Sequence, residues 1–351
     1  MTRIRFGSML NLAPYEEVVA HANLVEKSGL DSLWFPDHLE IVEKDLPCFD
    51  AWCILAAVAV HTKKVTLGPS VADPFRRHPA LLAQVLATLD RISRGRAVLA
   101  IGAGEAMNVV PFHIPWDRRV ARMQETIQIV RQLMTEHSVN YSGTFYQLSN
   151  AMLQVASVQK PSPPIYVAAN SPGTRKIAGM LGNGWIAQMM TPAMYEKDLR
   201  EVGLAAAKVG RSLEDVDVTY HANLAISEDY EEARRLAASA SRKMFVWWPN
   251  QLVRYGYTIA DELDWNRLIV ADDSEERTNH LSLEVPDEIA EEISIFGTPD
   301  DCISKIERYV RAGVTNFVFM IQGSLVRSYE LLERHVLRYF EETAGKSPLG
   351  N

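Results

Sequence analysis

Residues 96–110 read RAVLAIGAGEAMNVV, a strand pattern that runs directly into two closely spaced glycines. A dinucleotide-binding turn begins in the same way, but it needs a third glycine where this chain has Met107. Glu105 would occupy the place of the pyrophosphate, and two anions in contact repel each other. The stretch therefore favours a strand over 97–101 that ends in a loop of small residues and presents one carboxylate.

Strand patterns alternate with amphipathic helix patterns on both sides of this stretch. The eight predicted strands span 4–10, 32–35, 64–71, 96–102, 164–170, 184–189, 217–227 and 316–321. Helices are predicted over 15–29, 49–62, 78–93, 118–136, 172–182, 193–210 and 230–245, over a stretch capped by Thr298, and at the end up to about 343. The alternation predicts the α/β class and a (β/α)8 TIM barrel, with a doubly wound open sheet as the alternative.

The length of the chain is compatible with one barrel that carries insertions. Eight strand–helix units need about 250 residues, and this chain has 351. The surplus falls in a polar, hairpin-like segment at about 138–160 and in an irregular, aromatic-rich segment at about 243–295. We therefore expect a single barrel domain over 1–351, with two insertions that could each form a lid.

Composition limits the partners of the protein. The formal net charge of -8 argues against nucleic acid or an anionic membrane surface. The first residues lack the apolar core of a signal peptide, and no apolar run approaches the length of a membrane span. Cys48, Cys53 and Cys302 are too few for a disulfide framework and lack zinc-ligand spacing. We expect a cytoplasmic protein without a bound metal.

Several polar residues follow the predicted strands or, for the seventh strand, lie within it, at the barrel end where chemistry occurs in this architecture. They are Asp37, His38, Glu105, Asn108, His221 and Asn223. His38 and Glu105 are suited to proton transfer near neutral pH. Taken singly, His38 reads as a loop histidine and Glu105 as an acidic residue favoured at a helix start. Their meeting at one barrel mouth favours the functional interpretation.

Two further segments have both a functional and a structural interpretation. AANSPGTRK (168–176) places Ser171, Gly173, Thr174, Arg175 and Lys176 at a helix start, where a phosphate can bind. An ordinary serine cap followed by proline fits that segment equally well. FVWWPNQLVRYGY (245–257) fits a substrate wall or a subunit contact, although a buried aromatic cluster is the default expectation.

Four stretches together resemble the bacterial luciferase-like superfamily of flavin and deazaflavin enzymes. They are GLDSLWFPDH (29–38), HPALLAQVLATLDRISRGRAVLAIGAGEAMN (78–108), PIYVAANSPGTRKIAGMLGNGW (164–185) and FGTPDDCISKIERYVRAGVTNFVF (296–319). The resemblance covers most of the chain in the same order and leaves out only 243–295. The DH after the second strand and GEAMN after the fourth are similar to the branch that uses the deazaflavin coenzyme F420.

The resemblance implies a (β/α)8 fold and a coenzyme site at the barrel mouth. It places His38 and Glu105 beside the hydride-carrying C5 of the deazaflavin, and it puts a cis peptide bond at Ser70–Val71 behind the ring. It places the coenzyme phosphate on the helix start at NSPGT, which favours the functional interpretation there. The implied coenzyme-binding residues are Asp37, Ser70, Val71, Ala103, Gly104, Asn108, Ala168, Ala169, Asn170, Ser171, Gly173, Thr174 and Met189.

The implied reaction moves hydride between the deazaflavin C5 and a carbonyl, alcohol or imine-like small molecule. An FMN-dependent monooxygenase supplied by a separate flavin reductase is the alternative. HLEIV (38–42) lacks the tryptophan, and IAQMMTPAM (186–194) the lysine, that are typical of the sugar-phosphate enzymes of this branch. RFGSMLN (5–11) lacks the glutamate of its methanopterin reductases. Met189, Met190, Trp247 and Trp248 would form an apolar pocket, so we expect a lipophilic substrate. We also expect a homodimeric enzyme.

Overall fold

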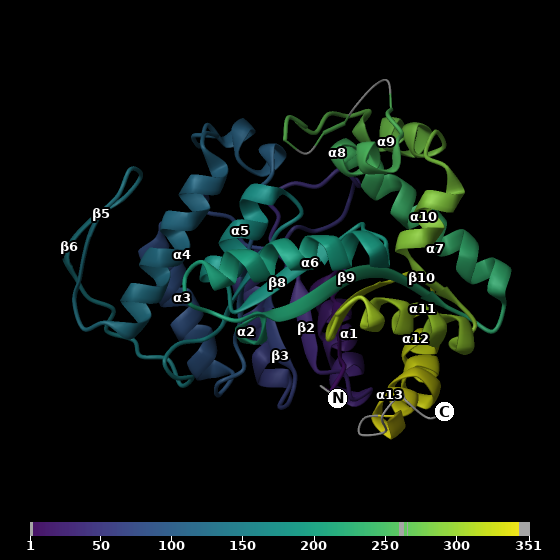
Figure 1. Ribbon diagram of the computed structural model, residues 1–351, viewed down its shortest axis with the longest axis horizontal. Coiled ribbons are helices and arrows are strands. Elements are labelled where there is room, and N and C mark those ends of the chain that lie inside the picture. The colour runs from purple at the N-terminus through teal and green to yellow at the C-terminus, as the bar shows by residue number, and fades with distance from the viewer. Residues whose placement is uncertain (1–2, 260–262, 265, 344–351) are drawn as a thin grey trace.

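The computed structural model describes residues 3–259, 263–264 and 266–343, and its centre is a ring of eight parallel strands (Figure 1). The strands are β1 (Arg5–Met9), β2 (Ser32–Phe35), β3 (Thr66–Pro69), β4 (Leu99–Ile101), β7 (Ile165–Ala168), β8 (Gly184–Gln188), β9 (Asp217–Ile226) and β11 (Asn316–Ile321). They are hydrogen-bonded in the order β3-β2-β1-β11-β9-β8-β7-β4. Parallel bridges Leu67–Ala97 and Ala72–Ile101 join β3 to β4 and close the ring. The predicted TIM barrel is confirmed, and the open doubly wound sheet is wrong.

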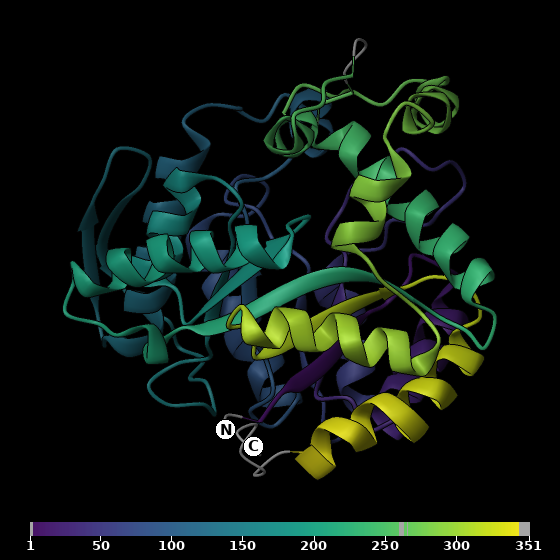
Figure 2. The same ribbon diagram turned by 45° about the vertical axis from the view of Figure 1, so that its right-hand side comes forward.

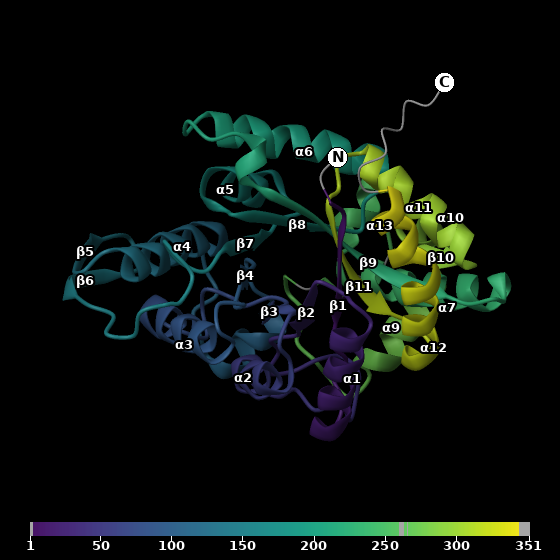
Figure 3. The same ribbon diagram turned by 90° about the horizontal axis from the view of Figure 1, so that it is seen from below.

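Helices form the outer layer of the barrel, as the view from below shows (Figure 3). They are α1 (Tyr15–Lys27), α2 (Ala51–His61), α3 (Pro79–Ile92), α4 (Arg119–Thr135), α5 (Pro172–Leu181), α6 (Pro192–Ala207), α7 (Tyr230–Trp247), α11 (Pro299–Arg311), α12 (Leu325–Leu331) and α13 (Arg338–Thr343). A π-helical turn, Leu332–Leu337, joins the last two. The expected cap of α11 is present, because Thr298 and Asp301 form a capping box. None of the helices in the described ranges is long and apolar enough to cross a membrane.

The barrel is packed on both faces of its strands. The main hydrophobic core lies between strands and helices. A smaller cluster fills the interior of the ring and consists of Trp34, Val98, Ala100, Tyr166, Ile186 and Val318. Because side chains fill the interior, the space for a ligand is at the carboxyl ends of the strands.

The first insertion is the expected hairpin, formed by β5 (Val139–Ser142) and β6 (Gln147–Ala151). The carboxylate of Glu125 on α4 accepts hydrogen bonds from the backbone N–H groups of Thr144 and Phe145 in the turn. The hairpin therefore lies along the outside of α4 (Figure 1). Its two strands flank the barrel rather than cover the mouth, so the expectation of a lid is wrong for this segment.

The second insertion is more regular than expected. Helix α7 continues to Trp247, and α8 (Pro249–Leu252), α9 (Ser274–Ser282) and α10 (Asp287–Ile293) follow within the described residues. A short strand that the sequence did not predict, β10 (Ile295–Gly297), pairs with the end of β9. The helices pack around a second hydrophobic cluster, which supplies the stability that their weak local patterns lack. We call the described residues between 248 and 294 the cap, and it lies beside the upper end of the barrel (Figure 2).

Candidate active site

His38 and Glu105 meet at the barrel mouth, as the sequence predicted. His38 lies three residues beyond β2, and Glu105 directly precedes the 3-10 turn Ala106–Asn108. The Nδ1 atom of His38 is 3.1 Å from Glu105 Oε2. This pair brings together an imidazole and a carboxylate from segments that are 67 positions apart in the chain.

Asn108 connects the two residues. Its Nδ2 donates a hydrogen bond of 2.9 Å to Glu105 Oε2 and lies 3.1 Å from His38 Nδ1. Its Oδ1 accepts the backbone N–H groups of Leu39 and Glu40 at 2.6 and 3.0 Å. One buried amide therefore holds both the loop after β2 and the carboxylate after β4.

The charges around His38 favour its protonated form. Burial by itself lowers the pKa of His38, but the carboxylate of Glu105 and its hydrogen bond outweigh burial. Asp37 acts in the same direction, whereas Arg76 opposes it. The net result is a raised pKa. The imidazole can therefore hold a proton near neutral pH and release it to an acceptor.

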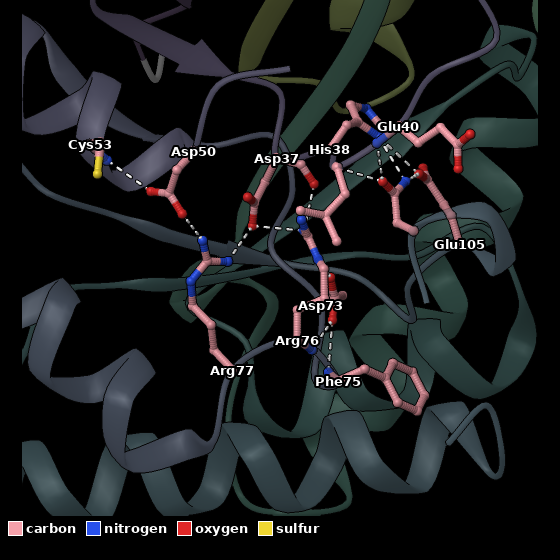
Figure 4. A network of polar contacts seen from close by, with 12 residues as sticks. Asp37, His38, Glu40, Asp50, Cys53, Asp73, Phe75, Arg76, Arg77 and Glu105 are labelled. Carbon is pink, nitrogen blue, oxygen red and sulfur yellow. Dashed lines mark hydrogen bonds and ion pairs between the residues drawn. The ribbon is translucent and has the colours of Figure 1, made fainter. Parts of the chain in front are cut away.

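Asp37 lies in an ion-pair network that the sequence reasoning missed (Figure 4). Its Oδ2 is 2.9 Å from Arg76 Nη2 and 3.0 Å from Arg77 Nη1. Arg76 also pairs with Asp73, and Arg77 with Asp50. Burial raises the pKa of Asp37, although both arginines oppose this. The signal in the sequence was the Arg-Arg pair just beyond the third strand, because β2 and β3 are neighbours.

The peptide bond between Ser70 and Val71 is cis, as the family resemblance implied. The Ser70 N–H donates to the carbonyl oxygen of Phe35 at 2.7 Å. Val71 and Ala168 pack on top of the interior cluster. A side chain at Gly102 would place its Cβ 2.8 Å from Val71 Cγ2 and 3.7 Å from the Ala168 Cβ. The floor of the mouth is therefore closely packed around Gly102, and a larger residue there would collide with Val71.

The start of α5 has both the helix cap and the exposed first turn that the two interpretations of the sequence require. Ser171 and Thr174 form a capping box, so the structural interpretation holds. Ser171 and Gly173 are also exposed, which leaves the first turn accessible to an anion. Arg175, expected beside a phosphate, is instead buried and pairs with Asp198 at 3.0 Å. Its charge compensates a buried carboxylate, so that part of the expectation is wrong.

The remaining predicted residues divide between the mouth and the packed layers. Ala103 and Gly104 are partly exposed at the rim, and Asn170 Oδ1 accepts the N–H of Gln188. The Ala169 side chain belongs to the main core, so only its backbone can contribute to the mouth. Met189 is buried in the cap cluster with a φ of 57°.

Met190 was expected in an apolar pocket with Met189, but it packs in the main core. Its carbonyl oxygen accepts hydrogen bonds from the hydroxyl groups of Tyr220 and Tyr309 at 3.0 and 2.8 Å. The pocket expectation is therefore wrong for Met190. Trp247 and Trp248 do reach the cap cluster together with Met189.

His221 and Asn223 lie on the inner wall of β9. His221 is the register partner of Val318, a member of the interior cluster. Burial lowers the pKa of His221 to about 4, so this imidazole is neutral at physiological pH. Asn223 Nδ2 donates to Ser241 on α7, and its Oδ1 accepts from Gln322. Asn223 thus links the barrel to the helix that leads into the cap.

Comparison with known proteins identifies relatives over nearly the whole chain. The family model described as luciferase-like monooxygenase matches residues 1–316. The 5,10-methylenetetrahydromethanopterin reductase of Archaeoglobus fulgidus is 30% identical over 311 residues, which cover 87% of this chain and 89% of the relative. An F420-dependent glucose-6-phosphate dehydrogenase of Amycolatopsis mediterranei is 31% identical over 320 residues, which cover 86% and 87%.

Solved structures share the fold. The coenzyme F420-dependent tetrahydromethanopterin reductase of Methanopyrus kandleri superposes with a TM-score of 0.81 at 24% identity and covers 96% of this chain and 99% of its own. This likeness extends over the barrel and its insertions.

Proposed function

This chain belongs to the luciferase-like monooxygenase family, and from this premise we propose that it is a coenzyme F420-dependent oxidoreductase. The proposed reaction transfers hydride between the deazaflavin C5 and a carbonyl, alcohol or imine-like substrate. The observation that carries this proposal is the His38–Glu105 pair at the mouth, because hydride transfer to a carbonyl requires a proton for the resulting oxygen anion. The names of the relatives from Archaeoglobus fulgidus and Amycolatopsis mediterranei support the choice of reaction class.

The mouth has the features that a flat, phosphate-bearing coenzyme needs. The floor at Val71, Gly102 and Ala168 has only small side chains, and Asp37 keeps a buried Oδ1 without a hydrogen-bond partner among the described residues. The exposed first turn of α5 would receive the phosphate through Ser171 and Gly173. Bound there, the deazaflavin would supply a carbon that accepts or donates hydride.

The residues of this chain would manage the proton. Glu105 holds His38 through Nδ1, and we assign the opposite nitrogen, Nε2, to the substrate oxygen. In the reductive direction His38 gives its proton to that oxygen, and Glu105 stabilises the cation before transfer. In the oxidative direction neutral His38 takes the proton from an alcohol.

The substrate that fits this mouth is lipophilic. Met107, Met189 and Met320 from the barrel and Trp247 from the end of α7 bring apolar side chains into one cluster beside the site. The resemblance gave no counterpart to the substrate-phosphate lysine of the sugar-phosphate enzymes, and the apolar cluster agrees with that departure. We therefore propose an apolar carbonyl or secondary alcohol rather than glucose 6-phosphate.

The second candidate is an FMN-dependent monooxygenase with a separate reductase, which the description of the family model favours. The relative affinities for F420 and FMN distinguish the F420-dependent oxidoreductase from the FMN-dependent monooxygenase. The purified protein is titrated separately with oxidised F420 and with FMN, followed by coenzyme fluorescence. We expect tighter binding of F420. Equal or tighter FMN binding, with oxygen consumption when a flavin reductase is added, would assign the protein to the monooxygenases.

We also propose that the enzyme works in the cytoplasm as a homodimer. Apolar side chains stand exposed on two neighbouring helices, with Val60 on α2 exposed by 70% and Leu81 on α3 by 57%. A contact between two copies of the chain through this helix pair would remove both side chains from water. Sedimentation equilibrium should give twice the chain mass, and a monomer at micromolar concentration would contradict the proposal.

A further inference from the structure

Arg76 connects two walls of the mouth, which are the loop after β2 with Asp37 and the loop after β3 with Asp73. Its Nη2 donates to the backbone carbonyl oxygen of Asp37 at 2.5 Å and lies 2.9 Å from the carboxylate of the same residue. Its Nε pairs with Asp73, whose Oδ1 also accepts the backbone N–H groups of Phe75 and Arg76 at 2.7 and 2.9 Å. The side chain of Arg76 is only 8% exposed.

The two connected segments carry the groups that the proposed function uses. Asp37 immediately precedes His38, and Asp73 follows the cis Ser70–Val71 peptide by two residues. Arg76 therefore fixes the wall that bears the proton donor against the wall that would lie behind the coenzyme ring. Figure 4 shows the guanidinium between the two carboxylates.

Arg77 provides the natural comparison. It contacts the same Oδ2 of Asp37, at 3.0 Å, but its other partner is Asp50 at the start of α2. Arg77 thus contacts the carboxylates of Asp37 and Asp50, whereas the Asp37 carbonyl oxygen and Asp73 are partners of Arg76. Of two adjacent arginines on one carboxylate, only Arg76 spans the two walls.

We infer that Arg76 is a positioning residue for the coenzyme site, which sets the Asp37–His38 segment relative to the Ser70–Val71 peptide. This inference rests on the proposed function. Its side chain contributes in two separable ways: the planar guanidinium bridges a carbonyl oxygen and a carboxylate, and its charge faces His38. A lysine can replace the charge but cannot reproduce a bridge with three donors in a fixed plane.

The charged groups that face His38 are Glu105 from the loop after β4, Arg76 from the loop after β3, and Asp37 and Glu43 from its own loop. Because Asn108 holds Glu105 and the backbone of Leu39 together without help from Arg76, the His38–Glu105 contact should survive changes at Arg76. Loss of the arginine charge should then raise the pKa of His38, since that charge opposes its protonation.

The experiment compares Arg76→Lys, Arg76→Gln and Arg77→Gln with the wild-type chain. F420 affinity is measured by fluorescence, and the titration of His38 is followed by NMR of its imidazole, assigned with His38→Ala. Both Arg76 variants should bind F420 about tenfold more weakly. The His38 midpoint should move up in Arg76→Gln and stay in place in Arg76→Lys. Arg77→Gln should weaken F420 binding less than threefold, roughly.

Thermal unfolding of each variant establishes that the chain is folded at the assay temperature. Wild-type F420 affinity in Arg76→Lys would overturn the inference, because charge alone would then suffice. An equal loss of affinity in Arg77→Gln would also overturn it. If the wild-type chain bound no F420, the proposed function would fall instead. The positioning role would then be decided in the free protein, by whether Arg76→Lys shifts the backbone amide signals of residues 37–40.

Discussion

At the scale of single residues, the mouth is organised by one amide. Asn108 holds the carboxylate of Glu105 and the backbone that follows His38, so the acid–base pair is fixed by hydrogen bonds to a buried neutral group. A neutral amide fixes the positions of both residues and adds no charge that would compete with theirs. Burial and Arg76 lower the pKa of His38, and the carboxylate of Glu105 raises it above its ordinary value.

Removal of either member of the pair should affect turnover far more than coenzyme binding. His38→Ala and Glu105→Gln should each lower turnover by about 10²–10⁴-fold, the usual contribution of a general acid–base group. The rates are measured with a ketone or alcohol that the wild-type chain turns over, and F420 affinity is measured in parallel. His61→Ala, on the exposed end of α2, is the matched control. Full turnover in either site variant would remove that residue from the mechanism.

The raised pKa of His38 predicts the pH dependence of each direction. Ketone reduction needs the protonated imidazole, so its rate should be full at low pH and fall as pH rises through the raised pKa of His38. Alcohol oxidation needs the neutral form and should show the opposite dependence. Glu105→Gln removes the main charge that raises the pKa, so its midpoint should lie lower than in the wild-type chain. An unchanged midpoint would show that another group titrates.

At the scale of elements, the start of α5 combines a structural and a binding role. Ser171 and Thr174 satisfy each other in the capping box, while the first turn stays exposed beside them. The Ser171–Thr174 capping box stabilises the start of α5 without occupying the space in front of its first turn. An anion there gains from the helix dipole and from backbone N–H groups.

An aspartate at Gly173 should separate the two roles. Space is available, since an added Cβ would meet only Val120 Cγ1 at 3.7 Å. A carboxylate in a first helical turn stabilises the fold by about 0.3–1 kcal/mol, but it would repel a bound phosphate. Gly173→Asp should therefore melt at or above the wild-type temperature and bind F420 at least about tenfold more weakly.

The matched control for this change is Gly173→Asn, which has nearly the same shape and no charge. A second control uses the phosphate-free deazariboflavin in place of F420, and its affinity should be unaffected by the aspartate. If Gly173→Asp binds F420 as tightly as the wild-type chain, the phosphate lies elsewhere.

At the scale of the whole molecule, two hydrophobic clusters meet at the mouth. The cap cluster contains Met107 and Met189 from the barrel loops, so the cap packs directly on the site. Asn223 on β9 bonds to Ser241 on α7, and β10 extends the sheet beside β9. The cap is therefore coupled to the barrel by packing, and the two elements that flank it in the chain, α7 and β10, are tied to β9 by a hydrogen bond and a strand pairing.

Truncation of a cap residue tests this coupling. Leu281→Ala removes a side chain that is 5% exposed within the cap cluster and should cost about 2–5 kcal/mol of the free energy of unfolding. Leu283, two residues on, is 70% exposed, and Leu283→Ala should stay within about 0.5 kcal/mol. Hydrogen exchange in the Leu281 variant should accelerate in α9 and α10 more than in the barrel strands. Uniform acceleration throughout the chain would mean that the cap has no cooperative core of its own.

Local patterns determined much of this protein. The strand of 316–321 was predicted to the residue, and the capping boxes of α5 and α11 follow from short motifs, because neighbouring side chains decide both. The family resemblance, which rests on four short stretches, correctly implied the cis peptide at Ser70–Val71. The pairing of His38 with Glu105 followed once eight strands were placed in one barrel, since parallel strands bring their carboxyl ends together.

Tertiary structure alone decided the rest. The cap helices have weak local patterns and are stabilised by contacts with residues far away in the chain, so periodicity could not reveal them. Arg175 looked like a phosphate ligand until Asp198, on the next helix, proved to be its partner. Nothing in the local sequence singled out Arg76, and only the adjacency of β2 and β3 brings it onto Asp37. The role of a charged side chain depends on its nearest opposite charge, and the fold rather than the local sequence decides which residue that is.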